Sequence, residues 1–158
     1  MATFFKPPRF LIRERAAPRQ VSNTPIEVTC YRCARPSTHS PFAETASCPH
    51  CAGRLQIGDV HIEHGHWGTS IQTTGSVVID QAAQVHANLI ICSGDLHIAG
   101  KVHAMCICGG RATISETADV QGGIRTSQLV LQPGAVIRGC LIETQSRALG
   151  KIDVDHAM

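Results

Sequence analysis

The sequence has no long apolar run. Among its 158 residues, no stretch approaches the ~18 consecutive apolar residues that a membrane-spanning helix requires. The early apolar segment is interrupted by Lys-Pro-Pro-Arg at residues 6–9, so we expect no secretory signal. The formal net charge is only +2, which does not indicate a nucleic-acid-binding surface over the whole protein. We therefore expect a soluble cytoplasmic chain.

Glycine and aromatic residues are each missing from one part of the chain. All 14 glycines lie at Gly53 or later, and no Phe, Tyr or Trp follows Trp67. A core of ordinary globular shape usually contains several large rings. Residues 68–158 therefore predict a narrow core of stacked, small aliphatic side chains. Two differently built regions meet near residue 52.

The N-terminal segment is basic and rich in proline. Residues 1–20 carry five cations and one anion, a local charge of +4, so the rest of the chain is at −2. We predict a disordered basic and aromatic tail over residues 1–25. The alternative is a membrane-surface anchor, in which rings enter the interface and cations meet anionic lipids. Its contacts would be Phe4, Phe5, Lys6, Arg9 and Phe10.

Two Cys-x-x-Cys pairs, Cys30/Cys33 and Cys48/Cys51, are separated by fourteen residues. Each pair can present two sulfurs from a tight turn, and four thiolates complete a tetrahedral shell. Soft thiolates favour Zn²⁺, although iron fits the same geometry, and His50 could replace one ligand. We predict a zinc ribbon over residues 26–54, with a structural rather than catalytic ion because four sulfurs close the shell. Disulfides or a redox pair are the alternatives.

Aliphatic residues recur downstream at separations of 16 to 19 residues. They form three columns: Ile62, Ile79, Ile98, Ile114 and Leu131; Val85, Val102, Val120 and Val136; and Ile71, Ile90, Ile107, Ile124 and Leu141. Apolar and polar residues alternate around each column, as in strands with one buried face. Three short strands per repeat predict a three-sided parallel β-helix of about five coils over residues 55–145, followed by a C-terminal tail at 146–158.

The handedness and the core follow from the same pattern. An aliphatic residue at every sixth position, typical of left-handed hexapeptide helices, does not persist in this sequence, so we predict a right-handed coil. The fold class is therefore all-β. The predicted core residues are Leu89, Ile90, Ile107, Ile124, Leu131 and Leu141.

Other histidines and cysteines favour structural roles. We interpret His61, next to His64 and His66, as solvent-facing rather than metal-binding, and expect His86 and His103 to form an outward two-step ladder. Because cysteine behaves as a small hydrophobe, we place the remaining four in the core or at corners of the coil: Cys92, Cys106, Cys108 and Cys140. No catalytic or nucleotide-binding grouping has a meaningful spacing, which argues against an enzyme.

An uncapped β-helix exposes strand edges and an aliphatic cross-section at its ends, which favours end-to-end self-association. We predict polymer contacts at Leu141 and Ile142. The segments Val-His-Ala at 85–87, Gly-Asp-Leu-His-Ile at 94–98 and the run at 129–139 resemble the bactofilins, bacterial polymer-forming cytoskeletal proteins. The resemblance covers roughly residues 57–145. It implies a right-handed β-helix that polymerises without nucleotide, with like ends meeting, and a membrane-binding segment that residues 2–12 could supply. The zinc ribbon departs from the family pattern.

We therefore predict a non-enzymatic cytoskeletal scaffold with structural zinc and no nucleotide. Its partners would be copies of itself, an anionic membrane at the inner face of the cell, and a protein recruited through the ribbon. Two alternatives remain. One is a zinc-ribbon adaptor that binds protein or nucleic acid with the β-helix as a spacer, and the other is a β-helix enzyme related to acyltransferases.

Overall fold

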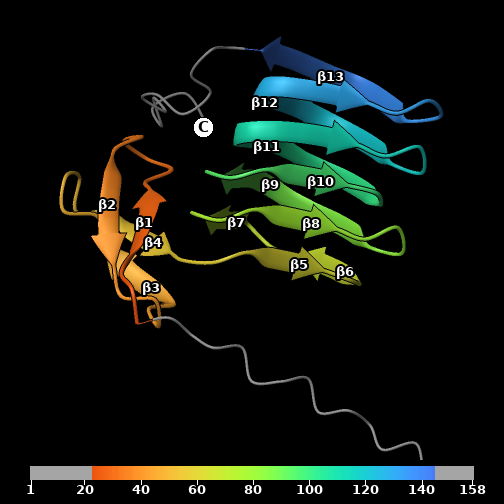
Figure 1. Cartoon of the computed structure of the whole chain (residues 1–158). Helices are drawn as coiled ribbons and strands as arrows, with labels where there is room; N and C mark the ends of the chain where they lie inside the picture. Colours follow the sequence, from red (N-terminus) through yellow and green to blue (C-terminus); the bar gives the residue numbers. More distant parts are fainter. Residues whose placement is uncertain (1–22, 145–158) are drawn as a thin grey trace, which may run out of the picture.

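The computed structural model describes residues 23–144, and all of its regular structure is β (Figure 1). A small N-terminal unit, here called the ribbon, consists of two antiparallel hairpins. Its strands are β1 (Ile26–Thr29), β2 (Pro36–His39), β3 (Thr45–Ser47) and β4 (Arg54–Gln56). Within the described residues, no helix is long and apolar enough to cross a membrane. The predicted all-β class is confirmed.

The rest of the described chain winds into a parallel β-helix of about five turns. Its strands are β5 (Val60–Ile62), β6 (Gly65–Trp67), β7 (Ser70–Thr73), β8 (Val77–Ile79), β9 (Gln84–Cys92), β10 (Leu96–Ile98), β11 (Lys101–Ile114), β12 (Asp119–Leu131) and β13 (Val136–Thr144). The near strands run to the right while the chain climbs from β5 to β13 (Figure 1), so the coil is right-handed, as predicted.

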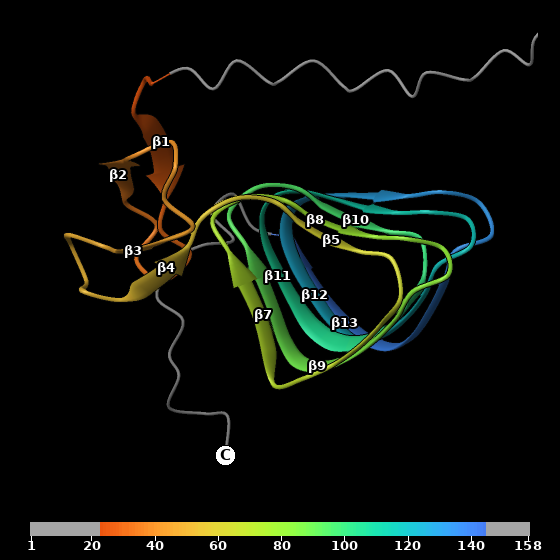
Figure 2. The ribbon, with the colours of Figure 1, turned by 90° about the horizontal axis from the view of Figure 1, so that it is seen from below.

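The strands form three faces, each a parallel stack. Face 1 contains β5, β8, β10 and the ends of β11 and β12. Face 2 contains β6 and the starts of β9, β11, β12 and β13. Face 3 contains β7, the end of β9, the middle of β11 and β12, and the end of β13. Viewed along the axis, the cross-section is roughly triangular (Figure 2).

The predicted column on face 1 is correct along its whole length. Ile62, Ile79, Ile98, Ile114 and Leu131 lie in direct register on successive coils. The first four are buried inside the coil. Leu131 lies on the last coil of this face and is 50% exposed, so its prediction as a core residue is wrong. Stacking at one position per coil explains why small aliphatic side chains fill the core without large rings.

The other two columns are each wrong by one residue in places. On face 2, Val120 pairs with Ile137 rather than Val136. On face 3, Ile90 pairs with Cys106, and Cys106 pairs with Ile124, so Ile107 points out of the coil.

The reason lies at the corner between faces 2 and 3, where the register shifts between His103 and Met105 and between Gln121 and Gly123. There β9 and β13 each carry one residue more than the strand beside them. A slip of one residue turns a side chain to the opposite side of the sheet. Leu89 and Leu141 also lie in an outward column, the first half-buried and the second exposed, so neither belongs to the interior core.

Buried polar side chains form one column at the next corner of the coil, with Thr73, Cys92, Cys108 and Thr126 on successive coils. The Thr126 hydroxyl donates to the Gly110 carbonyl at 2.9 Å, and the Cys108 thiol donates to the Gly94 carbonyl at 3.1 Å. The pKa of Cys92 is raised strongly, first by its hydrogen bond with Cys108 and then by burial, so it stays a neutral thiol. Cys92, Cys106 and Cys108 are buried as predicted, and the side chain of Cys140 lies outside the described part.

One glycine is required by close backbone approach. Gly122 has φ +130°, and a Cβ atom there would overlap the carbonyl oxygen of Ala104 on the neighbouring coil. Glycine alone combines this dihedral angle with the absence of a side chain. The tight corner between faces 2 and 3 in β12 therefore depends on this residue.

Candidate metal centre and assembly surfaces

Each Cys-x-x-Cys pair forms a turn of the same design between the two strands of a hairpin. The amide of Ala34 donates to the Cys30 carbonyl and that of Ala52 to the Cys48 carbonyl, both at 2.9 Å. Both alanines have left-handed φ angles, 58° and 57°. That conformation costs about 1 kcal/mol for a residue with a Cβ atom. The repeated pattern Cys-x-x-Cys-Ala, visible in the sequence but not used above, marks both turns.

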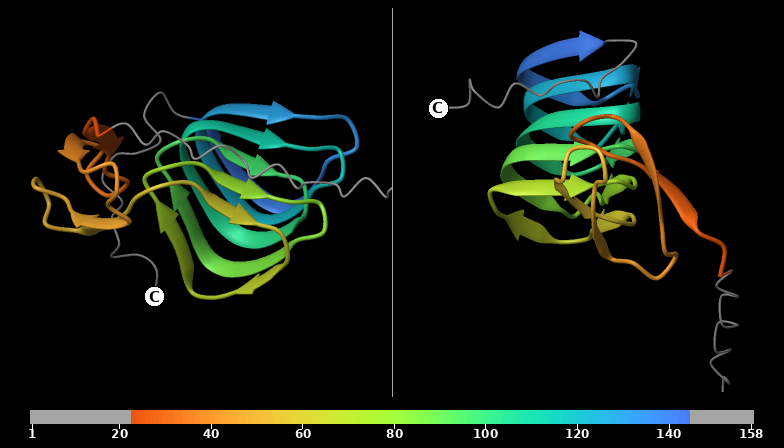
Figure 3. Two further views of the ribbon diagram at one scale, coloured as in Figure 1. Left: turned by 60° about the horizontal axis from the view of Figure 1, so that its bottom comes forward. Right: turned by 90° about the vertical axis from the view of Figure 1, so that its left-hand side faces the viewer.

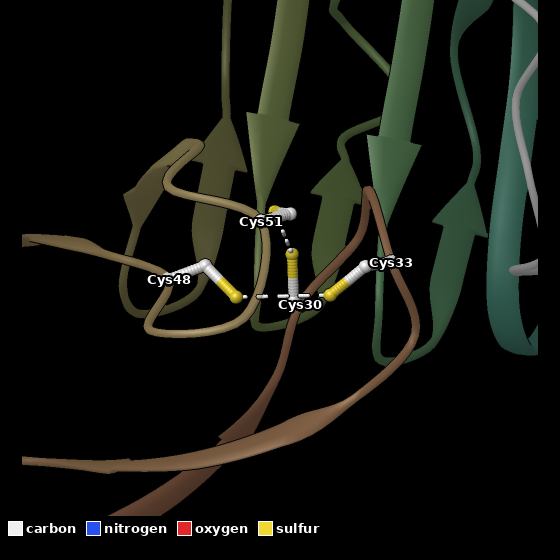
Figure 4. Close-up of side chains that lie close together, drawn as sticks. All are labelled: Cys30, Cys33, Cys48 and Cys51. Carbon is white, nitrogen blue, oxygen red and sulfur yellow. Dashed lines mark hydrogen bonds between the residues drawn. The ribbon is translucent and has the colours of Figure 1, made fainter.

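The two turns bring all four predicted thiols together (Figure 4). The sulfurs of Cys30 and Cys51 lie 3.8 Å apart and those of Cys33 and Cys48 lie 3.7 Å apart. All four sulfur atoms lie within 4.8 Å of one another. A regular tetrahedron with Zn–S bonds of about 2.3 Å has edges of about 3.8 Å. The four thiols therefore fit the shell of a single tetrahedral ion.

His50 does not face this cluster as a ligand. Its Nε2 atom donates to the Pro36 carbonyl at 3.2 Å, which joins the second turn to β2. The backbone amide of Arg32 points at the Cys30 sulfur from 3.3 Å. The geometry therefore favours four sulfur ligands over a mixed set with histidine.

The thiols differ in how easily they ionise. Burial raises the pKa of Cys30 to about 12. Burial also opposes ionisation of Cys48, but hydrogen bonds from the backbone amides of Cys51 and His50 and from neighbouring thiols outweigh it and lower the pKa of Cys48 to about 6. A bound divalent ion would hold the others in the deprotonated state that metal binding requires.

The ribbon packs against face 3 of the coil. Tyr31 and Leu55 share one buried cluster with Ile91 and Ile107 of the coil. The Ser93 hydroxyl donates to the Thr29 carbonyl at 2.7 Å, which ties β1 to the coil. Seen along the coil axis, the ribbon lies beside the triangular cross-section (Figure 2), and Figure 3 shows it on the flank of the lower coils.

This docking was not predicted, although the sequence carries a signal for it. Residues 89–92 read Leu-Ile-Ile-Cys, a continuous apolar run where an alternating pattern is expected of a half-exposed strand. Continuous apolar runs are typical of strands buried on both sides.

The upper end of the coil exposes a cluster of aliphatic side chains. Within residues 23–144, no strand pairs with the outer edge of β13. Leu141 is 61% and Ile142 is 42% exposed, and Ile142 occupies the interior column above Ile124. The structure thus places both predicted polymer contacts on the last described coil. Val130 and Leu131 at the end of face 1 and Val136 at the start of β13 on face 2 are also exposed.

The lower end is more polar. A hollow of about 470 Å³ opens beneath the first coil, with Ile62 and Ile71 at its apolar wall and His61, His64 and His66 around it. The imidazole of His61 lies 2.9 Å from the Asp80 carboxylate, and Glu63 is nearby. His61 is exposed, as predicted.

The family model of the bactofilins, described as polymer-forming cytoskeletal, matches residues 50–156. The chain belongs to the bactofilin family. No curated protein and no solved structure matches it significantly. The match begins at the second Cys-x-x-Cys turn and includes only Cys51 of the four thiols. Cys30, Cys33 and Cys48 therefore lie outside the residues that the family model matches.

The predicted histidine ladder exists and extends by one ring. His86 and His103 lie in register on face 2, with ring centroids 5.7 Å apart. Trp67 stacks on His86 from the coil below, with centroids 4.1 Å apart and planes 6° from parallel. Trp67 pairs with His86 in the strand register but precedes it by nineteen residues rather than seventeen, so the spacing of the two histidines could not have found it. In this bactofilin the ladder lies on the outer surface, away from the ribbon.

The predicted membrane contacts of this bactofilin lie outside the described residues. Phe4, Phe5, Lys6, Arg9 and Phe10 all belong to residues 1–22. They stay a prediction.

Proposed function

We propose that this bactofilin is a non-enzymatic scaffold that assembles end to end into filaments without nucleotide, at the cytoplasmic face of the membrane. The observation that supports it most is the upper end of the coil, where Leu131 and Ile142 are exposed as the last members of interior columns and no strand among residues 23–144 pairs with the outer edge of β13. Family membership supports polymer formation over the adaptor and acyltransferase alternatives.

The energetics of such a contact are favourable. A second copy placed on the last coil would bury the exposed half of several aliphatic side chains, worth about 1 kcal/mol each. It would also add a strand beside the outer edge of β13, with which no other strand among residues 23–144 pairs, and each new backbone hydrogen bond is worth roughly 0.5–1.5 kcal/mol. The contributions of these buried side chains and backbone hydrogen bonds add up over the cross-section of one coil. Binding free energy from a nucleotide is therefore not needed for assembly.

The test introduces a positive charge at the upper end of the coil in one variant and on the flank of the coil in another. Ile142→Lys puts an ammonium group in the interior column at the open end, and we expect the critical concentration for assembly to rise at least tenfold. Asn88→Lys is the control, because Asn88 is an exposed residue on β9 of the second coil, away from the upper end. Sedimentation and negative-stain microscopy give the readout, with and without ATP or GTP. Equal assembly of both variants, or a nucleotide requirement, would contradict the proposal.

We also propose that the ribbon holds one structural zinc ion through Cys30, Cys33, Cys48 and Cys51. The sulfur spacing supports this assignment. We expect a single zinc per chain by metal analysis of the purified protein, and its loss in Cys30→Ser. Cys92→Ser, at a buried cysteine of the coil, should keep the metal. Iron instead of zinc, or no metal in the intact protein, would refute the assignment.

Membrane association is the third part of the proposal. The rings and cations of residues 1–20 support it. Replacing Phe4, Phe5 and Phe10 by serine should abolish co-sedimentation with vesicles that contain anionic lipid. Phe42→Ser, at an exposed ring of the ribbon, is the control and should still bind. Equal pelleting of the two variants would show that the tail is no anchor.

A further inference from the structure

The ribbon covers an apolar part of face 3. The coils above and below it carry polar residues at the equivalent positions. One outward column of face 3 consists of Gln72, Ile91, Ile107, Arg125 and Glu143. The two isoleucines lie on the second and third coils, where the ribbon covers them, and they are only 3% and 5% exposed. Above these two coils the column is charged, and Arg125 and Glu143 form an ion pair of 2.7 Å there.

A second outward column continues the apolar surface along the axis of the coil. It contains Leu89, Met105, Gly123 and Leu141 on successive coils. Leu89 contacts the ribbon cluster, whereas Met105 is 40% exposed. We define the flank stripe as Leu89, Ile91, Met105, Ile107 and Leu141. The ribbon covers its lower part.

The ribbon has little besides the thiol cluster to hold its fold. Its strands have three or four residues each, and its buried side chains are Cys30, Cys48, Tyr31, Leu55 and Ser37. A unit of this size folds chiefly through metal binding. Loss of the ion would therefore unfold the ribbon and uncover Ile91 and Ile107, while residues 57–59 keep it attached to β5.

We propose that the ribbon is a metal-dependent cover over a lateral assembly surface, whose partner is the flank stripe of a second copy of this chain. With metal bound, filaments stay single; without it, they pack side by side. This inference rests on the proposed filament assembly and on the proposed zinc site of the ribbon.

Three features of the flank support a second copy as the partner. The stripe is continuous with the interface that the ribbon already occupies. It runs along the coil axis, so every subunit of a filament would present it to a neighbouring filament. At its border, Arg125 and Glu143 carry opposite charges, which two copies related by a two-fold axis would place opposite each other.

The test removes the metal from assembled filaments of the full chain with a thiol-competent zinc chelator. We expect the fraction pelleted at low speed to rise several-fold, with bundles in negative stain. Ile91→Gln with Ile107→Arg replaces the two isoleucines by residues that the same column carries below and above them. This variant should still form filaments but should not bundle after chelation. Single filaments of the original chain after confirmed zinc release, or equal bundling of the variant, would overturn the proposal.

A second measurement tests the proposed cover independently of the proposed filament assembly. Below the assembly concentration, chelation should raise the fluorescence of a hydrophobic dye several-fold in the original chain and little in the double variant. Cys48→Ser, which removes a ligand, should behave like chelated protein. If filaments never form but this dye response appears, the cover stands and the filament proposal fails. If the dye response is absent, or equal in the variant, the cover is wrong.

Discussion

Truncating Ile98 to alanine should cost far more folding stability than truncating Leu131, although both residues lie in the same column of face 1. Ile98 is fully buried between Ile79 and Ile114. Its truncation removes buried methyl and methylene groups and leaves a cavity that the neighbouring coils cannot close. Such substitutions cost about 2–5 kcal/mol. Leu131 is half exposed on the last coil, so its truncation loses about half the transfer free energy and encloses no cavity, about 1 kcal/mol.

The assay is urea denaturation followed by far-ultraviolet circular dichroism, at a protein concentration below that of assembly. The midpoint should fall clearly for Ile98→Ala and slightly for Leu131→Ala. Assembly should show the reverse order, because Leu131 is at the proposed contact and Ile98 is not. Equal losses of unfolding free energy in the two variants would refute the stacked-column account of the core.

Three further outcomes follow from local geometry. Gly122→Ala should prevent stable folding, seen as loss of the β signal in circular dichroism, because its Cβ atom overlaps a carbonyl of the coil below and its φ is left-handed. The hydrogen bond to Asp80 raises the pKa of His61; its stabilisation is therefore complete below the ordinary histidine value and is lost as pH rises through the raised one. NMR titration of the ring should show this pKa falling toward the ordinary value in Asp80→Asn. Tyr31→Phe should cost about 1 kcal/mol of unfolding free energy in thermal denaturation, because the Tyr31 hydroxyl donates to the Arg54 carbonyl at 2.7 Å.

The fold class could be predicted because the repeat is a property of spacing. In the column from Ile62 to Leu131, one aliphatic residue recurs every 16 to 19 residues, and these residues lie in register on successive coils. The separations can be counted directly in the sequence. Register on face 3 could not be predicted in the same way, because the corner before it holds one residue more in β9 and β13 than in their neighbours. Ile107 lies seventeen residues after Ile90, but Cys106 occupies the interior position next to Ile90, so the side chain of Ile107 points out of the coil.

The gathering of the four cysteines could be predicted, because the spacing of two thiols within a tight turn is local. The place of the ribbon on the coil could not be predicted, since it depends on a buried cluster whose members, such as Tyr31 and Ile91, are far apart in the sequence. In the sequence, the docking of the ribbon is indicated by the continuous apolar run at residues 89–92, which places apolar side chains on both sides of β9.

The position of the ribbon on the lower coils has a consequence for the appearance of a filament. About five coils with a spacing of ~4.8 Å give a subunit close to 24 Å long. If like ends meet, two ribbons flank each junction of lower ends, and the next junction has none beside it. The side projections would then come in doublets with an axial repeat of about 48 Å, a periodicity that image averaging of single filaments can measure.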